Sequence, residues 1–294
     1  MRALLLNAVI AIFLSSLLFL APSCCKTVTV YVTTTPTRTP TPMPTPVAGI
    51  WKPTSAAPIH WQWQIGEPLQ IPSHLIPGVT VYDIDWEQND ASVVKALHDR
   101  GFKAIAYLEA GDWTSGRADA GQFPASVIGN QIDGWSDKWL DIRSPVVRQI
   151  LAARLDAIKA KGFDAVEPDC IDGYSNDTGF PLTYADQIDF NRWIATECHA
   201  RGLSVGLKGD IEQVVDLQPY FDWCLNEECY QYDECGDLSA FINANKAVFQ
   251  VEYKATGQCS YMNSQHINSM RRNLDLTASG VRTPCIPDTQ NTWN

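Results

Sequence analysis

Residues 162–174 read Gly-Phe-Asp-Ala-Val-Glu-Pro-Asp-Cys-Ile-Asp-Gly-Tyr, a short apolar run that follows a helix-ending glycine and finishes in carboxylates. This length and composition are typical of a buried parallel strand. Because side chains alternate along a strand, Glu167 and Asp169 share one face, and Pro168 is tolerated because the strand ends there. A single Asp-x-x-Asp pair, here Asp169 and Asp172, usually marks solvated loop acids. Repetition of the pattern along the chain favours a shared site instead.

The pattern of an apolar run that ends in an acid recurs elsewhere. Residues 78–86 place Asp83 and Asp85 on one face near the end of a strand, and residues 104–109 end in Glu109. Capping residues and apolar residues at helical spacing separate most of these runs. We predict strands at residues 61–65, 78–86, 104–109, 139–142, 162–169, 204–208, 223–227 and 247–253, and helices at residues 89–99, 145–161, 184–199, 211–217 and 238–245.

Eight predicted strands that mostly alternate with helices predict an α/β fold, an eight-stranded parallel (β/α) barrel of the TIM type in a single domain. An open doubly wound sheet is the alternative. No predicted strand is followed by Gly-x-Gly-x-x-Gly or Gly-x-x-x-x-Gly-Lys, so nucleotide binding has no support. Such barrels carry their chemistry at the carboxyl ends of the strands, where this chain places one lysine and seven acids: Lys208, Asp83, Asp85, Glu109, Asp141, Glu167, Asp169 and Glu227.

The first 50 residues differ in composition from the rest. Residues 3–21 are almost entirely apolar and are followed by small residues that suit signal-peptidase cleavage. We therefore expect residues 1–23 to be a signal peptide; the alternatives are a retained signal anchor, because the run is long enough to span a bilayer, and a lipoprotein with lipidated Cys24. Residues 24–50 are rich in Thr and Pro and predict an extended linker. The barrel domain, residues 51–294, is then secreted or extracellular, and membrane-anchored only if the apolar segment is retained.

The folded part of the chain is strongly acidic. The whole chain has a formal net charge of −11, and its first 46 residues contain three basic residues and no acid, which leaves −14 on the remainder. Such a surface repels nucleic acid and favours cationic or neutral partners. The alternative is that the acidity only keeps a secreted protein soluble.

Nine cysteines in a secreted chain predict disulfides. Their spacing pairs Cys229 with Cys235 and Cys259 with Cys285. The sequence leaves open the pairing of the remaining three, which have room for one further pair and one free thiol: Cys170, Cys198 and Cys224. We expect no zinc site, because no Cys-x-x-Cys pair or neighbouring His cluster provides the usual ligand spacing.

Several stretches in one order resemble glycoside hydrolase family 114. Residues 162–180 read Gly-Phe-Asp-Ala-Val-Glu-Pro-Asp-Cys-Ile-Asp-Gly-Tyr-Ser-Asn-Asp-Thr-Gly-Phe, residues 202–210 read Gly-Leu-Ser-Val-Gly-Leu-Lys-Gly-Asp, and residues 225–235 read Leu-Asn-Glu-Glu-Cys-Tyr-Gln-Tyr-Asp-Glu-Cys. The likeness extends through Trp-Gln-Trp-Gln, Ala-Tyr-Leu-Glu-Ala-Gly-Asp-Trp and Phe-Gln-Val-Glu-Tyr, and so covers residues 58 to about 285. Gly209 and Cys170 depart from the pattern, since both positions are expected to be Asn.

The resemblance implies an eight-stranded α/β barrel and internal cleavage of α-1,4-linked galactosamine polymers of the galactosaminogalactan type. It places the two catalytic carboxylates on Asp169 and Glu227. Glycoside hydrolysis needs one protonated and one ionised carboxyl group, and two acids in one pocket repel, which separates their pKa values. We predict Asp169 as the nucleophile and Glu227 as the acid/base. Glu228 is the alternative, but strand alternation puts it on the opposite face.

Ten further residues are predicted to bind substrate. The charged ones would bond sugar hydroxyls or amino groups, and the aromatic ones would stack on sugar faces. The alternatives are structural pairing of the acids with Lys208 or loop amides, and a barrel-core role for Trp63 and Tyr107. The ten residues are Asp83, Asp85, Glu109, Glu167, Asp172, Lys208, Trp63, Tyr107, Trp113 and Tyr174.

The expected partner is a cationic or partly deacetylated polysaccharide, bound by a monomer without a metal or another cofactor and without nucleic acid. Rival functions are a sugar-binding protein that has lost catalysis, a metal-dependent phosphodiesterase and a glycosidase of another specificity, because a fold does not fix a substrate. Asn176-Asp-Thr178 is the only Asn-x-Ser/Thr sequon, and we expect it to lie in an exposed, glycosylated loop if the source is eukaryotic.

Overall fold

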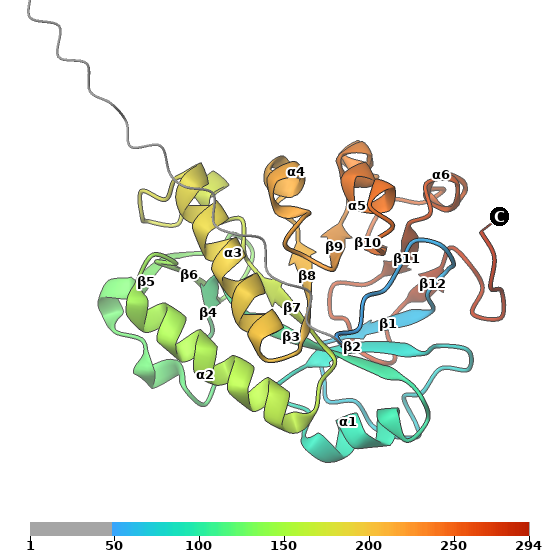
Figure 1. The fold of residues 1–294 in the computed structure, drawn as a ribbon, viewed down its shortest axis with the longest axis horizontal. Coiled ribbons are helices and arrows are strands. Elements are labelled where there is room, and N and C mark those ends of the chain that lie inside the picture. The colour runs from blue at the N-terminus through green and yellow to red at the C-terminus, as the bar shows by residue number, and fades with distance from the viewer. Residues whose placement is uncertain (1–48, 294) are drawn as a thin grey trace, which may run out of the picture. The chain divides into compact units, whose positions relative to one another are not determined.

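The computed structural model describes residues 49–293 (Figure 1). The predicted signal peptide or anchor and nearly all of the Thr/Pro-rich linker lie outside the described residues. Within residues 49–293, no helix is both long and apolar enough to cross a membrane.

The described chain is built around a curled sheet of nine strands. Its first eight strands pair in parallel and the ninth is antiparallel to its neighbour, so the predicted parallel α/β architecture is confirmed. In spatial order the strands are β1 (Trp61–Gln64), β2 (Val81–Asp85), β3 (Lys103–Glu109), β7 (Ala165–Asp169), β8 (Ser204–Lys208), β9 (Trp223–Glu227), β10 (Val248–Glu252), β11 (Asn268–Arg272) and β12 (Arg282–Pro284).

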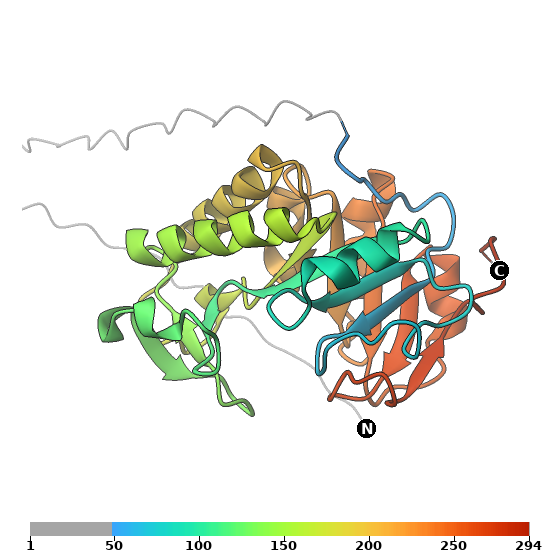
Figure 2. The same cartoon turned by 90° about the horizontal axis from the view of Figure 1, so that it is seen from below.

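The helices lie outside this sheet (Figures 1 and 2). Pro145 starts the long helix α2, and Gly162, at φ +94°, ends it in the left-handed region that glycine adopts at low cost. Thr183 and Asp186 form a reciprocal capping box at the start of α3. The helices are α1 (Ala91–His98), α2 (Pro145–Lys161), α3 (Tyr184–Ala200), α4 (Val214–Leu217), α5 (Ser239–Asn243) and α6 (Cys259–Ser264).

A separate three-stranded antiparallel sheet corrects the predicted strand assignment. It consists of β4 (Asp112–Trp113), β6 (Lys138–Leu140) and β5 (Ile128–Gln131), in that order. We call it the accessory sheet. The prediction of a barrel strand at residues 139–142 is therefore wrong, and Asp141, which pairs with Arg143, is not a barrel-strand acid.

The eighth parallel strand is β11, which the sequence did not predict; it pairs with β10, while β3 and β7 pair directly. Its sequence Asn-Ser-Met-Arg-Arg lacks an apolar run, and its polar side chains are buried by specific hydrogen bonds. Asn268 Nδ2 donates to Val248 O at 3.0 Å, and Ser269 Oγ donates to Gln250 Oε1 at 2.6 Å. Periodicity of hydrophobic residues cannot detect a strand whose burial depends on partners from another strand.

The two ends of the curled sheet are connected through side chains. Trp61 Nε1 in β1 donates to Asn268 O in β11 at 3.0 Å, and Arg272 Nη1 in β11 donates to Gln62 Oε1 at 2.9 Å. Arg282 Nη2 in β12 donates to Trp61 O at 2.8 Å. The sheet thus curls into a barrel-like form, although its strand pairings are those of an open nine-stranded order.

Two hydrophobic cores hold the barrel domain together. One lies inside the curl and is built from large rings such as Trp61, Trp63, Trp223 and Phe249, and the other lies between the sheet and its helices. Gly206 faces the Trp223 ring, where a Cβ would come within 2.3 Å of ring carbon, so only glycine fits this packing.

The structure confirms the two predicted disulfides, Cys229–Cys235 and Cys259–Cys285. The structure decides the alternative left open for the other three, because Cys170, Cys198 and Cys224 are all free thiols. Cys170 follows the carboxyl end of β7 whereas Cys224 lies in the first half of β9, so these two cysteines belong to opposite ends of the parallel sheet.

Candidate active site

A pocket of about 860 Å³ opens at the carboxyl ends of the parallel strands. Its walls include loops that follow the strands, the accessory sheet and the segment between β11 and β12. Of the predicted site residues, eight line it together with the sequon residue Asn176: Trp63, Asp85, Tyr107, Glu109, Asp169, Asp172, Lys208 and Glu227.

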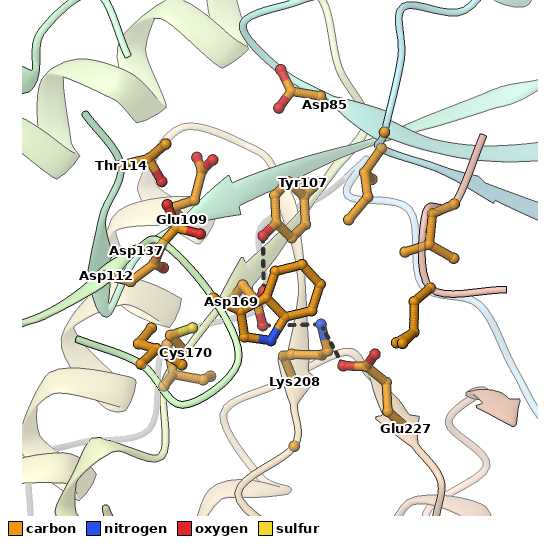
Figure 3. Close-up of a pocket in the computed structure, with 18 of the residues that line it drawn as sticks. Asp85, Tyr107, Glu109, Asp112, Thr114, Asp137, Asp169, Cys170, Lys208 and Glu227 are labelled. Carbon is orange, nitrogen blue, oxygen red and sulfur yellow. Dashed lines mark hydrogen bonds and ion pairs between the residues drawn. The ribbon is translucent and has the colours of Figure 1, made fainter. Parts of the chain in front are cut away.

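Lys208, at the end of β8, is the centre of the charged network (Figure 3). Its Nζ lies 2.8 Å from Glu167 Oε1, 3.0 Å from Asp169 Oδ1 and 3.3 Å from Glu227 Oε2. Burial disfavours its charge, but the three carboxylates hold the pKa of Lys208 well above its ordinary value. One ammonium therefore links the two predicted catalytic acids across neighbouring strands.

Asp169 is held as a carboxylate. Burial opposes its ionisation, but the Lys208 ammonium and hydrogen bonds from Lys208 and Tyr107 lower the pKa of Asp169 below its ordinary value. The Tyr107 hydroxyl donates to Asp169 Oδ2 at 2.9 Å. Burial and the Asp169 charge raise the pKa of Tyr107 well above its ordinary value, so this hydroxyl keeps its proton and remains a donor.

Glu227 ends β9 on the other side of Lys208, and its side chain is 35% exposed to the pocket. The hydroxyl of Tyr253 donates to Glu227 Oε1. Sequence reasoning missed Tyr253 as a site residue, although it is the last residue of the predicted strand 247–253 and directly follows β10 in the structure. Glu228 also lines the pocket, because it follows the strand with a left-handed φ of +58°, and the argument from strand alternation is therefore wrong.

Glu167 and Asp83 lie beneath the pocket and do not line it. Both are fully buried, which corrects the prediction that they contact substrate. Glu167 Oε2 accepts from Trp63 Nε1 at 3.0 Å, and burial raises the pKa of Glu167 to about 7 against the opposing effect of Lys208. Burial and the Glu167 carboxylate raise the pKa of Asp83 well above its ordinary value. Glu167 supports Lys208 from below, and Asp83 lies buried near Glu167.

Asp85 and Glu109 line the pocket but are bound by Arg117, a residue that sequence reasoning missed. Arg117 Nη1 lies 3.0 Å from Asp85 Oδ1, and Nε lies 2.7 Å from Glu109 Oε1. Loop amides of Glu87 and Gln88 also donate to Asp85 Oδ1. Structural pairing is thus observed for both acids, with Arg117 and loop amides as partners instead of Lys208. The only sequence signal was an arginine eight residues after a strand-end acid.

The remaining predicted residues separate into two groups. Asp172 lines the pocket, and burial followed by the Asp169 charge raises the pKa of Asp172 to about 6. Trp113 and Tyr174 do not line it, which corrects their predicted stacking role. Trp113 Nε1 donates to Ala120 O at 3.1 Å, and the Tyr174 hydroxyl donates to Glu212 Oε2 at 2.8 Å. Asn176 is exposed at the pocket.

The pocket contains ten carboxyl side chains but only two basic ones, Arg117 and Lys208. Over residues 49–293, no group of three or more His, Cys, Asp or Glu side chains is arranged to hold a metal ion. The geometry combines an ionised acid, a second more exposed acid and a strongly negative wall, an arrangement that suits acid/base and nucleophilic chemistry on a neutral or cationic substrate.

Comparison with known proteins gives a consistent result. Residues 41–290 match glycoside-hydrolase family GH114. The crystal structure of Aspergillus fumigatus Ega3 in complex with galactosamine is 34% identical with a TM-score of 0.74, over 79% of this chain and 97% of that chain. The glycoside hydrolase domain of PelA from Pseudomonas aeruginosa shares the fold at 15% identity and a TM-score of 0.57, over 76% of this chain and 97% of that chain. A comparison with curated proteins gave no match.

Proposed function

Because this chain belongs to glycoside hydrolase family 114, we propose that it cleaves α-1,4-linked galactosamine polymers internally, with Asp169 as the nucleophile and Glu227 as the acid/base. The observation that carries the proposal is the pair of carboxylates joined by Lys208 in a pocket with a large excess of acids. The similarity to Ega3, whose crystal structure contains galactosamine, supports the choice of sugar.

The separation of the two acids favours retention of configuration. Asp169 Oδ1 and Glu227 Oε2 lie 3.0 and 3.3 Å from the same nitrogen, so they are closer together than the roughly 6.5–9.5 Å that inverting enzymes leave for a water molecule. Asp169 would attack the anomeric carbon while protonated Glu227 gives its proton to the leaving oxygen. Glu227 would then take a proton from water, which attacks the same carbon and releases the Asp169 carboxylate.

Two neighbours would keep these roles apart. Lys208 and Tyr107 stabilise the Asp169 anion, which is the state a nucleophile needs. Glu227 is the more exposed of the two, since its side chain is 35% exposed against 22% for Asp169, so it is better placed to exchange protons with water. We assign the acid/base role to Glu227 on this ground.

The substrate's charge fits the pocket. A polymer with free amino groups carries a positive charge on nearly every sugar, and ten carboxyl groups against two basic groups attract it. An N-acetylated polymer of the same backbone lacks this attraction. We propose that the enzyme acts within deacetylated stretches.

The chain is proposed to act outside the cell. Its two disulfides are of the kind that form and persist in oxidising compartments. A folded domain carried on a Thr/Pro-rich linker after a signal segment would reach a polysaccharide at the cell surface or in the surrounding medium.

The direct test is release of oligomers from an α-1,4-galactosamine polymer by the purified protein, compared with Asp169→Asn and Glu227→Gln. We expect each substitution to lower turnover by at least about a hundredfold, the effect of removing a positioned acid or base. Both variants should still fold, which circular dichroism checks. Near-native activity of either variant, together with loss of activity in Glu228→Gln, would show that the assignment is wrong.

A further inference from the structure

The accessory sheet supplies one wall of the pocket, yet the proposed mechanism uses none of its residues. Gly111 precedes this sheet and brings it close to the nucleophile strand, since its amide donates to Asp169 O at 3.0 Å and a Cβ there would meet Cys170 O at 1.7 Å. Figure 3 shows Asp112 and Asp137 of this wall on the opposite side of the pocket from Glu227.

Trp135 presents an aromatic surface on this wall. It lies in the turn between β5 and β6, lines the pocket, and is 54% exposed. Its backbone is fixed, because its amide donates to Ile132 O at 3.1 Å and its carbonyl accepts from Gln131 Nε2 at 2.6 Å. An indole that is left half exposed on a fixed turn at a pocket can receive the apolar face of a sugar ring.

Asp112 provides a buried carboxyl group on the same wall. It is only 3% exposed, and its Oδ1 has no hydrogen-bond partner among the described residues. Glu109 Oε2, on the adjoining strand, likewise has none, because Arg117 binds the other oxygen of Glu109. A buried carboxyl oxygen without a partner costs free energy that a donor from a ligand would recover.

No basic side chain of residues 49–293 forms an ion pair with Asp112 or Asp137. Burial, followed by the charges of Glu109, Asp169 and Asp137, raises the pKa of Asp112 well above its ordinary value. Within the described residues this wall has no cation that would stabilise the Asp112 carboxylate, and the ammonium group of a ligand could supply one. The described acids are not arranged as a metal site.

We propose that the accessory sheet is a subsite for one amino sugar of the substrate, with Trp135 against the sugar ring and Asp112, assisted by Asp137, receiving the ammonium group. The inference rests on the proposed function, and it assigns to this wall the discrimination between free and acetylated amino groups. Stacking on Trp135 would contribute equally to the binding of acetylated and deacetylated sugars. The Asp112 contact would contribute only when the amino group is free.

The two contacts can be separated by binding measurements without turnover. In a Glu227→Gln background, isothermal titration calorimetry would compare an α-1,4-galactosamine oligomer with its N-acetylated counterpart of equal length. We expect Trp135→Ala to weaken both oligomers by about tenfold, and Asp112→Asn to weaken only the deacetylated one by about tenfold, as for loss of a charge-assisted hydrogen bond. Asp112→Asn keeps the side-chain shape and is expected to fold.

The same chain offers matched controls. Asp133→Asn makes the same charge change on an exposed residue of the same turn, and Tyr232→Ala removes an exposed ring, and neither residue lines the pocket. Introduced into the Glu227→Gln background, both substitutions should leave the affinity for the two oligomers unchanged.

The outcomes distinguish this inference from the proposed function. If Asp112→Asn weakens both oligomers equally or neither, or if Trp135→Ala has no effect, the subsite is wrong. Failure of the Glu227→Gln protein to bind either oligomer also overturns the proposed subsite. Failure of the wild type to hydrolyse the galactosamine polymer would instead refute the proposed function, while the binding measurements would still decide the subsite.

Discussion

At the scale of single residues, the position of Lys208 explains why so many acids can be crowded at one end of the barrel. Its ammonium lies within 3.3 Å of three carboxylates, and two of these are the proposed catalytic pair. Glu167 below it is buried and has its pKa raised to about 7. Part of the negative charge is therefore neutralised by protonation of Glu167. The two proposed catalytic acids share the Lys208 ammonium.

This arrangement predicts how stability depends on pH. A carboxyl group with a raised pKa in the folded protein contributes stability that is full below its ordinary pKa of 4.5 and is lost as pH rises through about 7. We therefore expect Glu167→Gln to gain free energy of unfolding relative to wild type as pH rises from about 4.5 to about 7. Urea unfolding of both proteins at several pH values in this window measures it. A difference that is constant with pH would contradict the role given to Glu167.

At the scale of elements, the segment after β4 matters as much as the barrel strands. Arg117 from this segment is only 8% exposed and binds Asp85 and Glu109 at the ends of β2 and β3. The catalytic end of the sheet is thus held together by a loop that belongs to no barrel strand.

Removing this arginine should be strongly destabilising. We expect Arg117→Met to lower the free energy of unfolding by about 3–5 kcal/mol, because it leaves two buried carboxylates without their cation. Arg143→Met is the control, since Arg143 forms a more exposed pair with Asp141 and should cost no more than about 1 kcal/mol. Equal losses in chemical denaturation would show that the Arg117 network does not stabilise the site.

At the scale of the whole molecule, net charge determines the long-range electrostatic attraction of a cationic substrate before any contact forms. The pocket's acids lie on a barrel domain that is itself strongly acidic. Salt screens such attraction over a Debye length of about 8 Å at physiological ionic strength.

Added salt should therefore raise KM for the deacetylated polymer. We expect the increase to be severalfold between low and high ionic strength, with little change for the acetylated polymer, because each exposed contact is worth only about 0.2–1 kcal/mol but several act together. Steady-state kinetics on both polymers in a salt series measures this. If kcat/KM is equal on the two substrates and does not change with salt, the prediction is wrong. The acidity would then serve only to keep the protein soluble.

The sequence by itself determined the parallel α/β architecture, two disulfides and the positions of Asp169, Lys208 and Glu227, because these depend on local patterns. An apolar run that ends in a charged residue identifies a buried strand and its functional end, and the paired cysteines are 6 and 26 residues apart in sequence. The family motifs are similarly local stretches.

Only the tertiary structure decided which acids face the pocket and which support it from below. Asp83 and Glu167 lie two residues before Asp85 and Asp169 in β2 and β7, and they are buried beneath the pocket, whereas the two strand-end acids line it. Arg117, Tyr253 and the polar strand β11 reach their places through long-range contacts. Periodicity along the chain carries no information about contacts between segments far apart in sequence, which is the physical reason for these differences.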